Sequence, residues 1–175
     1  MRIGYVSTKC VSRFDFQNPR TEDIRIEDIA HALSNLCRFN GHTRKFYSVA
    51  EHCCHVHDSL IDHKKWGLMH DAAEAYLGDI VNPVKALLPE FKVLEERLLQ
   101  KVTERFGLKW PIPKLVHHID VLMCKTEALD LLGEDFHFID GNILDVTFPC
   151  WEPGIAQKQF MERYNENVRT ESSSG

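Results

Sequence analysis

The chain of 175 residues is 43% hydrophobic and carries a formal net charge of −5 at pH 7. This length and composition fit one domain with its own apolar core. The negative charge provides no global field that would attract nucleic acid. No apolar run approaches the length of a membrane span, and the first residues lack the pattern of a signal peptide. We therefore expect a soluble cytoplasmic protein with no nucleic-acid or membrane partner.

Six cysteines occur along the chain, and none of them forms a C-x-x-C pair. Such cysteines in a cytoplasmic protein are expected to be reduced and mostly buried, which argues against a structural zinc knuckle. The chain also contains ten histidines, and their positions matter more than their number.

The N-terminal part is predicted to contain an extended piece followed by a helix. Residues 1–19 alternate roughly between apolar and polar, which predicts a short hairpin or extended arm. Apolar residues at helical spacing predict a helix within residues 24–39. The Asn-Gly pair within residues 38–43 then forms a loop. Loops that gather Arg, His and Thr suit phosphate oxygens, although a surface turn with a solvated Arg is the alternative.

The next predicted helix covers residues 48–61. Ser48 is a good N-cap within a capping box. His52 lies at the border of the apolar stripe, where a single histidine is more often a core residue with satisfied hydrogen bonds than a metal ligand. His55 and His57 lie elsewhere on the helical wheel and are expected to face solvent.

The most informative run places His70 and Asp71 side by side among apolar residues that predict a helix buried on most sides. Glu74 and Asp79 follow, and then the cation Lys85. Buried carboxylates are costly without a compensating positive charge, which a divalent metal ion would supply. The alternative is that the acids lie on a solvated face and His70 is an ordinary core histidine.

Amphipathic periodicity predicts three further helices, over residues 91–106, 114–132 and 155–168. Residues 136–153 are irregular and are expected to cover the core as a loop. Residues 170–175 form a polar tail that is expected to be disordered. These patterns predict one all-α domain over residues 1–169.

Asp120 lies on the apolar face of a predicted helix, where a carboxylate needs a partner. With His52, His70 and Asp71 it gives two imidazoles and two carboxylates from three helices. This set suits a divalent transition metal such as Zn, Mn, Fe or Co. Adjacent His and Asp side chains diverge on a helix, so one ion reaches both only between the helices of a bundle.

The order of these residues resembles the HD superfamily of metal-dependent phosphohydrolases. The resemblance covers roughly residues 26–132 and rests on His52, on His70-Asp71-Ala-Ala-Glu74, and on Asp120 in His-His-Ile-Asp-Val-Leu-Met. Within the superfamily the chain is similar to small bacterial 5′-deoxynucleotidases and phage dATP triphosphohydrolases. Those proteins share an Arg-aromatic pair ahead of the first His, and a Glu, an Asp, a Pro and a Lys after the His-Asp pair.

The resemblance implies an HD-domain helical bundle, with a metal core at about residues 26–132 and metal ligation by His52, His70, Asp71 and Asp120. Zn is the expected ion, with Co or Mn as alternatives. A bound ion of this kind lowers the pKa of water toward about 7 and polarises a phosphoryl oxygen. Water would then attack phosphorus beside the sugar 5′-oxygen.

The resemblance also implies roles for residues around the ion. Glu74 and Asp79 would orient water or transfer protons, and the sequence leaves open which of them is the general acid. The expected substrate-binding residues are Arg38 and Lys85 for phosphate, Phe39 and Pro83 for base and sugar, and His42, with Arg44 and Lys45 as further cations near the same loop.

The number of these cations favours a triphosphate over a monophosphate, and the adenine preference comes from the resemblance. We therefore expect a dATP triphosphohydrolase that releases deoxyadenosine and triphosphate, with a second ion such as Mg accompanying the triphosphate. A 5′-deoxynucleotidase acting on monophosphates is the alternative enzyme. A non-catalytic nucleotide sensor is a third possibility, which Glu74 and Asp79 argue against. Family analogy implies a homo-oligomer built from dimers, in the host cytoplasm if the chain is phage-encoded.

Overall fold

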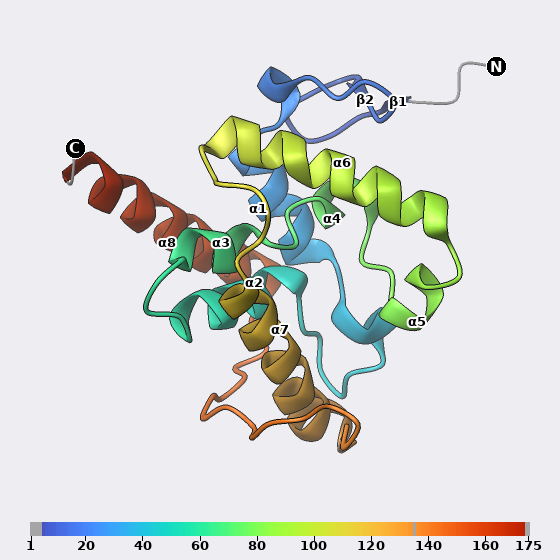
Figure 1. Ribbon diagram of the computed structural model, residues 1–175, viewed down its shortest axis with the longest axis vertical. Helices are drawn as coiled ribbons and strands as arrows, with labels where there is room; N and C mark the ends of the chain where they lie inside the picture. Colours follow the sequence, from blue (N-terminus) through green and yellow to red (C-terminus); the bar gives the residue numbers. More distant parts are fainter. Residues whose placement is uncertain (1–4, 135, 174–175) are drawn as a thin grey trace.

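The computed structural model describes residues 5–134 and 136–173, and it is predominantly helical, as predicted (Figure 1). The longer helices are α1 (Ile26–Asn35), α2 (Val49–Asp58), α3 (Lys64–Met69), α6 (Pro89–Phe106), α7 (Lys114–Glu127) and α8 (Pro153–Ser173). Two single-turn helices are α4 (Glu74–Leu77) and α5 (Asn82–Lys85). Shorter turns of 3₁₀ or π type cover Thr21–Asp23, Arg38–Gly41 and Ala128–Leu132.

Of the two forms predicted for the N-terminal part, a short hairpin or an extended arm, the described residues show the hairpin. Strand β1 (Tyr5–Val6) pairs antiparallel with β2 (Phe14–Asp15), so that Val6 lies opposite Phe14. Phe14 is fully buried and stacks on Tyr76, with ring centroids 4.3 Å apart. The hairpin therefore packs on α4 and closes one end of the core.

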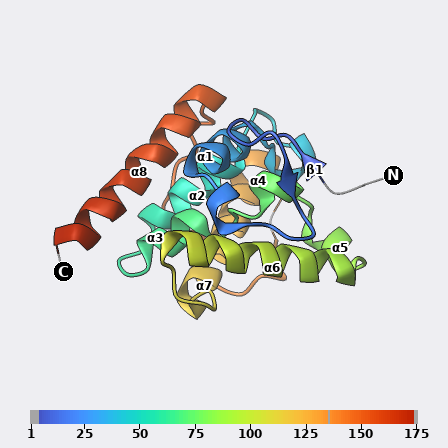
Figure 2. The ribbon, with the colours of Figure 1, turned by 90° about the horizontal axis from the view of Figure 1, so that it is seen from above.

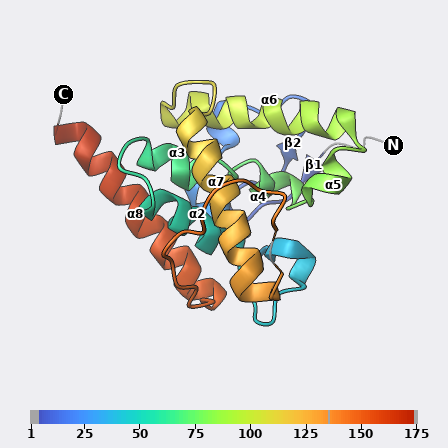
Figure 3. The same cartoon turned by 60° about the horizontal axis from the view of Figure 1, so that its bottom comes forward.

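Helix α2 lies at the centre and packs against α1, α3, α7 and α8. Viewed from above, α1, α2 and α4 lie between α8 and α6 (Figure 2). Ser48 caps α2 as predicted, because its hydroxyl accepts the backbone N–H of Glu51 at 3.1 Å. Helix α7 lies beside α2 and α3 on another face of the molecule (Figure 3).

The apolar core has two parts. The larger part joins the hairpin, α1, α2, α3, α6 and α8. A smaller cluster lies between α2, α3 and α7 and is formed by Val56, Leu60, Trp66, Val116 and Met123. Since α2 belongs to both parts, its side chains are held on several sides, which is what a precise site requires.

The single helix expected around His70 is interrupted. Helix α3 ends at Met69, and residues 70–73 form turns in which the N–H of Ala72 bonds the carbonyl of Met69 at 3.0 Å. Gly78, at φ +85°, then ends α4. Backbone hydrogen bonds between residues three apart replace the four-residue spacing of an α-helix here. His70 and Asp71 therefore do not lie on one regular helix.

The C-terminal segments differ from prediction in extent. Helix α7 ends at Glu127 and continues as the π turn Ala128–Leu132. Residues 138–152 contain no helix or strand, in agreement with the predicted covering loop. Helix α8 reaches Ser173, so the tail predicted to be disordered is helical over residues 170–173. Ser174 and Gly175 lie outside the described residues.

His55 and His57 do not face solvent, contrary to prediction. His57 is buried, and its Nδ1 lies 2.7 Å from Asp58 Oδ1. The ring of His55 stacks on Trp151 with centroids 5.7 Å apart. The loop before α8 and α8 itself cover this side of α2, which the periodicity of α2 alone does not reveal.

The described part of the chain contains neither a membrane-spanning helix nor a disulfide bond. No helix there has the length and apolarity needed to cross a membrane. All six cysteines lie in described positions, and each is a free thiol. The prediction that they are mostly buried is wrong, because only Cys53 and Cys54 are buried and Cys10 and Cys37 are exposed.

Candidate metal centre

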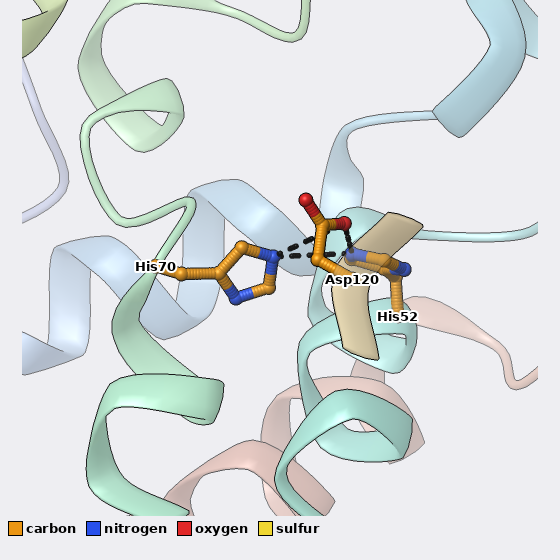
Figure 4. A group of neighbouring side chains, drawn as sticks. All are labelled: His52, His70 and Asp120. Atoms are coloured by element: carbon orange, nitrogen blue, oxygen red, sulfur yellow. Dashed lines mark hydrogen bonds and ion pairs between the residues drawn. The ribbon is translucent and has the colours of Figure 1, made fainter. Parts of the chain in front are cut away.

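Three nitrogen and oxygen donors from separate segments converge at one corner beside α2. Figure 4 shows His52 from α2, His70 from the turn after α3, and Asp120 from α7 pointing toward one another. The Nε2 atom of His52 lies 3.2 Å from Oδ1 of Asp120 and 3.2 Å from Nε2 of His70. The three atoms form a triangle, and its remaining distance, from His70 Nε2 to Asp120 Oδ1, is 3.6 Å.

Asp71 brings a fourth donor to the same nitrogens. Its Oδ2 lies 3.7 Å from Nε2 of His52 and 3.4 Å from Nε2 of His70. Donors held by a tetrahedral Zn²⁺ with bonds of about 2.0–2.1 Å lie roughly 3.3–3.4 Å apart. His52, His70 and Asp120 are therefore brought together at separations that fit a divalent ion, and Asp71 lies at similar distances from both histidines. The mixed nitrogen and oxygen donors suit a transition metal.

Both imidazoles turn their Nε2 atoms toward this corner because their other nitrogens are engaged. The Nδ1 of His70 lies 2.8 Å from the carbonyl of Gly67 in α3. The Nδ1 of His52 lies 2.6 Å from Oε1 of Glu127, at the end of α7. In each ring Nδ1 is placed to donate, so Nε2 is the nitrogen whose lone pair would be offered to a metal ion once its proton is displaced.

The carboxylates create a strong demand for positive charge at this corner. Burial lowers the pKa of His70, but Asp71 and Asp120 outweigh burial and raise that pKa to about 9. Burial raises the pKa of Asp120, whereas hydrogen bonds with His52 and His70 bring it well below its usual range. A divalent cation would satisfy the same carboxylates in place of protons.

A cavity of about 520 Å³ opens beside the corner, within the size range of about 300–1,000 Å³ typical of small-molecule sites. Asp71 and Asp120 form part of its polar wall, together with Glu74 and Asp79. Its apolar wall is formed by Phe39, Ile80, Val81, Pro83, Val121, Phe136, Phe138 and Ile139. The cavity therefore places an apolar surface directly against the candidate metal centre.

A second cavity of about 450 Å³ meets the corner from the side of α6. Its lining includes His70, Trp110 and Ile112, and it adds the charged residues Lys92, Glu95 and Glu96 of α6. The two cavities share Asp71, Glu74, Asn82, Lys85, His117 and Asp120. The candidate metal centre thus lies where an apolar chamber and a charged one join.

Glu74 lies at this junction and is paired with Lys85. The Nζ of Lys85 donates to Oε1 of Glu74 at 2.8 Å and to Oε1 of Glu95 at 2.6 Å. Burial raises the pKa of Glu74 well above its usual value, and Asp71 and Asp79 raise it further. Its Oε2 is buried and has no hydrogen-bond partner among the described residues. One carboxylate oxygen of Glu74 is therefore left unpaired at the junction of the two cavities.

The segment Arg38–Gly41 is folded as a turn with unusual backbone angles. Phe39 and Asn40 both have φ +52°, in the left-handed region that non-glycine residues rarely adopt. The N–H of Arg38 anchors the turn by bonding the carbonyl of Tyr47 at 3.0 Å. This backbone places Phe39 in the wall of the cavity, and such strain is often found at functional sites.

The predicted phosphate-binding cations separate into two groups. Arg38 and Lys85 line the cavity, whereas His42, Arg44 and Lys45, all in the described part of the chain, line neither cavity. The Nη2 of Arg44 instead lies 3.4 Å from the carbonyl of Leu132. The lining cations are already paired, Lys85 with two glutamates and Arg38 with Glu127 at 2.9 Å. Fewer free positive charges face the cavity than predicted.

Comparison with known proteins places the chain in a family. It is 35% identical to the uncharacterized protein YfdR of Escherichia coli strain K12, over 94% of this chain and 96% of that protein. The chain belongs to the YfdR family. It is also 38% identical to the uncharacterized protein RCAP_rcc00048 of Rhodobacter capsulatus, over 69% of each chain. No family model matches the chain.

Sequence reasoning missed several residues at the site of this YfdR-family chain. Glu127 and Tyr47 stand behind His52, and Glu95 pairs with Lys85. Glu127 lies seven residues after Asp120 on the same helix. An acid in that apolar pattern indicates a buried carboxylate that needs a partner, so the sequence did contain a signal for Glu127. The sequence contained no such signal for Glu95, because its helix is largely solvent-exposed there.

Cys53 is a further donor that the sequence did not single out. Its sulfur groups with donors of His70 and Asp71 within 4.8 Å. Burial raises the pKa of the Cys53 thiol well above its usual value. The described donors form two overlapping groups that share His70, one with His52 and Asp120 and the other with Cys53 and Asp71.

Proposed function

We propose that this protein is a metal-dependent phosphohydrolase of the HD type that acts on a small deoxynucleotide. The observation that carries the proposal is the convergence of His52, His70, Asp71 and Asp120 beside an apolar cavity, whose wall includes Asp71 and Asp120. Metal-ligating donors alone would fit a structural ion. The position of Asp71 and Asp120 in the wall of a cavity large enough for a nucleoside supports a catalytic one.

The four donors would hold one divalent ion, and Zn²⁺ fits the donor set best. Such an ion would polarise a phosphoryl oxygen and lower the pKa of water to about 7, which would provide the nucleophile for phosphoryl transfer. The apolar wall with Phe39 and Phe138 would hold the base and sugar. That position directs the 5′-phosphate toward Asp71 and Asp120, which line the same cavity.

Glu74 and Asp79 would supply proton transfer. Both line the cavity beside the ligands, and burial raises the pKa of each carboxyl. A carboxyl with a raised pKa holds a proton more readily and can donate it to the leaving 5′-oxygen. Lys85 would keep Glu74 oriented through its 2.8 Å contact. Neither residue is needed for binding alone, which favours an enzyme over a sensor.

The cations favour a monophosphate as the substrate. Among the described residues predicted to bind phosphate, those that line the cavity are Arg38 and Lys85, each paired with carboxylates. A triphosphate brings more negative charge and needs more unpaired cations than this cavity offers. The geometry therefore supports a 5′-deoxynucleotidase best. A triphosphohydrolase with dATP as substrate is the second candidate, supported by the sequence resemblance.

Product analysis separates these activities. The purified protein should be incubated with each of the four deoxynucleoside monophosphates and triphosphates, in Zn²⁺, Mn²⁺ or Co²⁺. Release of orthophosphate from monophosphates is the expected result. Release of triphosphate, greatest from dATP, would establish the second candidate instead. Nucleotide binding without turnover in any of these metals would reject both and leave the sensor.

A further inference from the structure

Glu127 is a fully buried carboxylate in which both oxygens have partners. Its Oε1 accepts hydrogen bonds from the hydroxyl of Tyr47 at 2.8 Å and from Nδ1 of His52 at 2.6 Å. Its Oε2 accepts from Nε of Arg38 at 3.0 Å, and the Nη2 of Arg38 lies 2.9 Å away. A buried charge requires this degree of pairing, so each partner is also held in place by Glu127.

Helix α7 reaches the candidate metal centre at two points. Asp120 lies beside the Nε2 atoms of both histidines, and Glu127 lies behind the His52 ring. The two acids are seven residues apart, which is about two helical turns, so they project from nearly the same face. Helix α7 thus contributes Asp120 directly to the candidate metal centre, and it holds the ligand His52 through Glu127.

The contact with Glu127 decides which nitrogen of His52 is free. An imidazole that donates Nδ1–H to a carboxylate leaves the lone pair on Nε2, and such a partner also makes that nitrogen a better ligand. His52 is fully buried, and its Nε2 faces His70, Asp71 and Asp120. Without Glu127 the other tautomer would place a proton where the metal ion belongs.

We infer that Glu127 is a positioning residue, which fixes the tautomer and orientation of His52 and thereby sets the affinity of the centre for its metal ion. This inference rests on the proposed metal-dependent function. Arg38 extends the arrangement, because its Nη1 lies 3.8 Å from Asp71 Oδ2. Arg38 therefore connects Glu127, which holds the proposed ligand His52, to Asp71, which is itself a proposed ligand.

The first test is Glu127→Gln. A glutamine amide presents NH₂ to one side, so it cannot accept from both His52 and Arg38. Zn²⁺ affinity, measured by competition with a chelator, should fall by about 10–100-fold. The matched control is Glu51→Gln, since Glu51 is equally buried but accepts the N–H groups of Cys150 and Trp151. The control should lose stability and keep wild-type Zn²⁺ affinity.

The second test uses the unaltered protein and does not depend on a variant that folds. Nitrogen-15 NMR of the His52 ring should show a proton on Nδ1, with and without Zn²⁺. An unprotonated Nδ1 in either state would overturn the inference, as would wild-type Zn²⁺ affinity in folded Glu127→Gln. If the unaltered protein binds none of Zn²⁺, Mn²⁺ and Co²⁺, the proposed function fails instead, and the NMR result still decides what Glu127 does to His52.

Discussion

The Nε2 atoms of His52 and His70 face each other at 3.2 Å, and both rings are buried. Their Nδ1 atoms form hydrogen bonds with Glu127 and Gly67. Each ring is therefore held in the core through Nδ1, and Nε2 is left for another partner. Two imidazole nitrogens at this distance can both bind one proton or one cation. The carboxylates of Asp71 and Asp120 beside them favour a doubly charged cation.

His70→Ala and Asp120→Ala should each remove metal binding and activity together. Each change deletes one of the donors of the proposed metal centre, and the loss of Zn²⁺ affinity should exceed the range of about 10–100-fold seen for residues behind a ligand. Metal content after dialysis, measured by atomic spectroscopy, checks this. His118→Ala is the matched control on α7. Full metal occupancy in Asp120→Ala would mean that another residue is the fourth ligand, and His117, which lines both cavities, would be tested next.

Arg38→Ala should destabilise the fold as well as weaken phosphate binding. The substitution leaves Glu127 buried without its cation, and breaking such a pair costs about 3–5 kcal/mol. Urea unfolding measures this loss. Arg44→Ala is the control on the same loop, expected to change the unfolding free energy by less than about 0.5 kcal/mol. Equal unfolding free energies for Arg38→Ala and the unaltered protein would show that Glu127 is not held as a buried anion.

The residues that the sequence identified are those whose order along the chain carries information. His52, His70, Asp71 and Asp120 stand in a recognisable sequence order, and the structure brings them together. The cap at Ser48 was also predictable, because capping depends on neighbouring residues. These features follow from local sequence and from spacing.

Other features depend on contacts between distant segments, and the sequence did not show them. The turn that interrupts the helix at His70 gives its ring a carbonyl from Gly67 as partner, which no periodicity predicts. Arg38 was assigned to phosphate from its place in a loop, yet its closest partner, Glu127, lies 89 residues away. His57 was assigned to solvent because the helix α8 that covers it lies at the far end of the chain.

Gly67→Ala should destabilise the protein, although alanine usually stabilises a helix interior. A Cβ at this position would lie 2.6 Å from Cδ1 of Leu60 and 3.1 Å from the Cα of His57. The backbone of α2 cannot move away without disturbing the core, so overpacking should cost about 1–3 kcal/mol. Because Gly67 also holds His70 through its carbonyl, Zn²⁺ affinity should fall as well. Gly154→Ala is the control, since a Cβ there meets no atom of the described residues within 4 Å. A stabilised Gly67→Ala protein would show that α2 and α3 are not packed so closely.

The contact between Asp58 and Arg163 should make the attachment of α8 depend on pH. Arg163 Nε donates to Oδ1 of Asp58 at 3.0 Å. Burial raises the pKa of Asp58, but hydrogen bonds from His57 and Arg163 outweigh burial and lower it strongly. A lowered pKa means that the carboxylate stabilises the fold above the ordinary aspartate value of about 3.9, and that this contribution is lost as the pH falls through the lower folded value.

Asp58→Asn tests this dependence. The side chain of Asp58 is about half exposed, so solvent screening limits the loss to about 0.5–1 kcal/mol at pH 7. Urea unfolding at pH 7 and below pH 3 should show the difference between Asp58→Asn and the unaltered protein shrinking as acid is added. Glu162→Gln, which removes an exposed pair with Lys158 at 3.8 Å, should have little effect at either pH. A deficit in Asp58→Asn that is equal at both pH values would mean that packing of the side chain, rather than its charge, attaches α8 to α2.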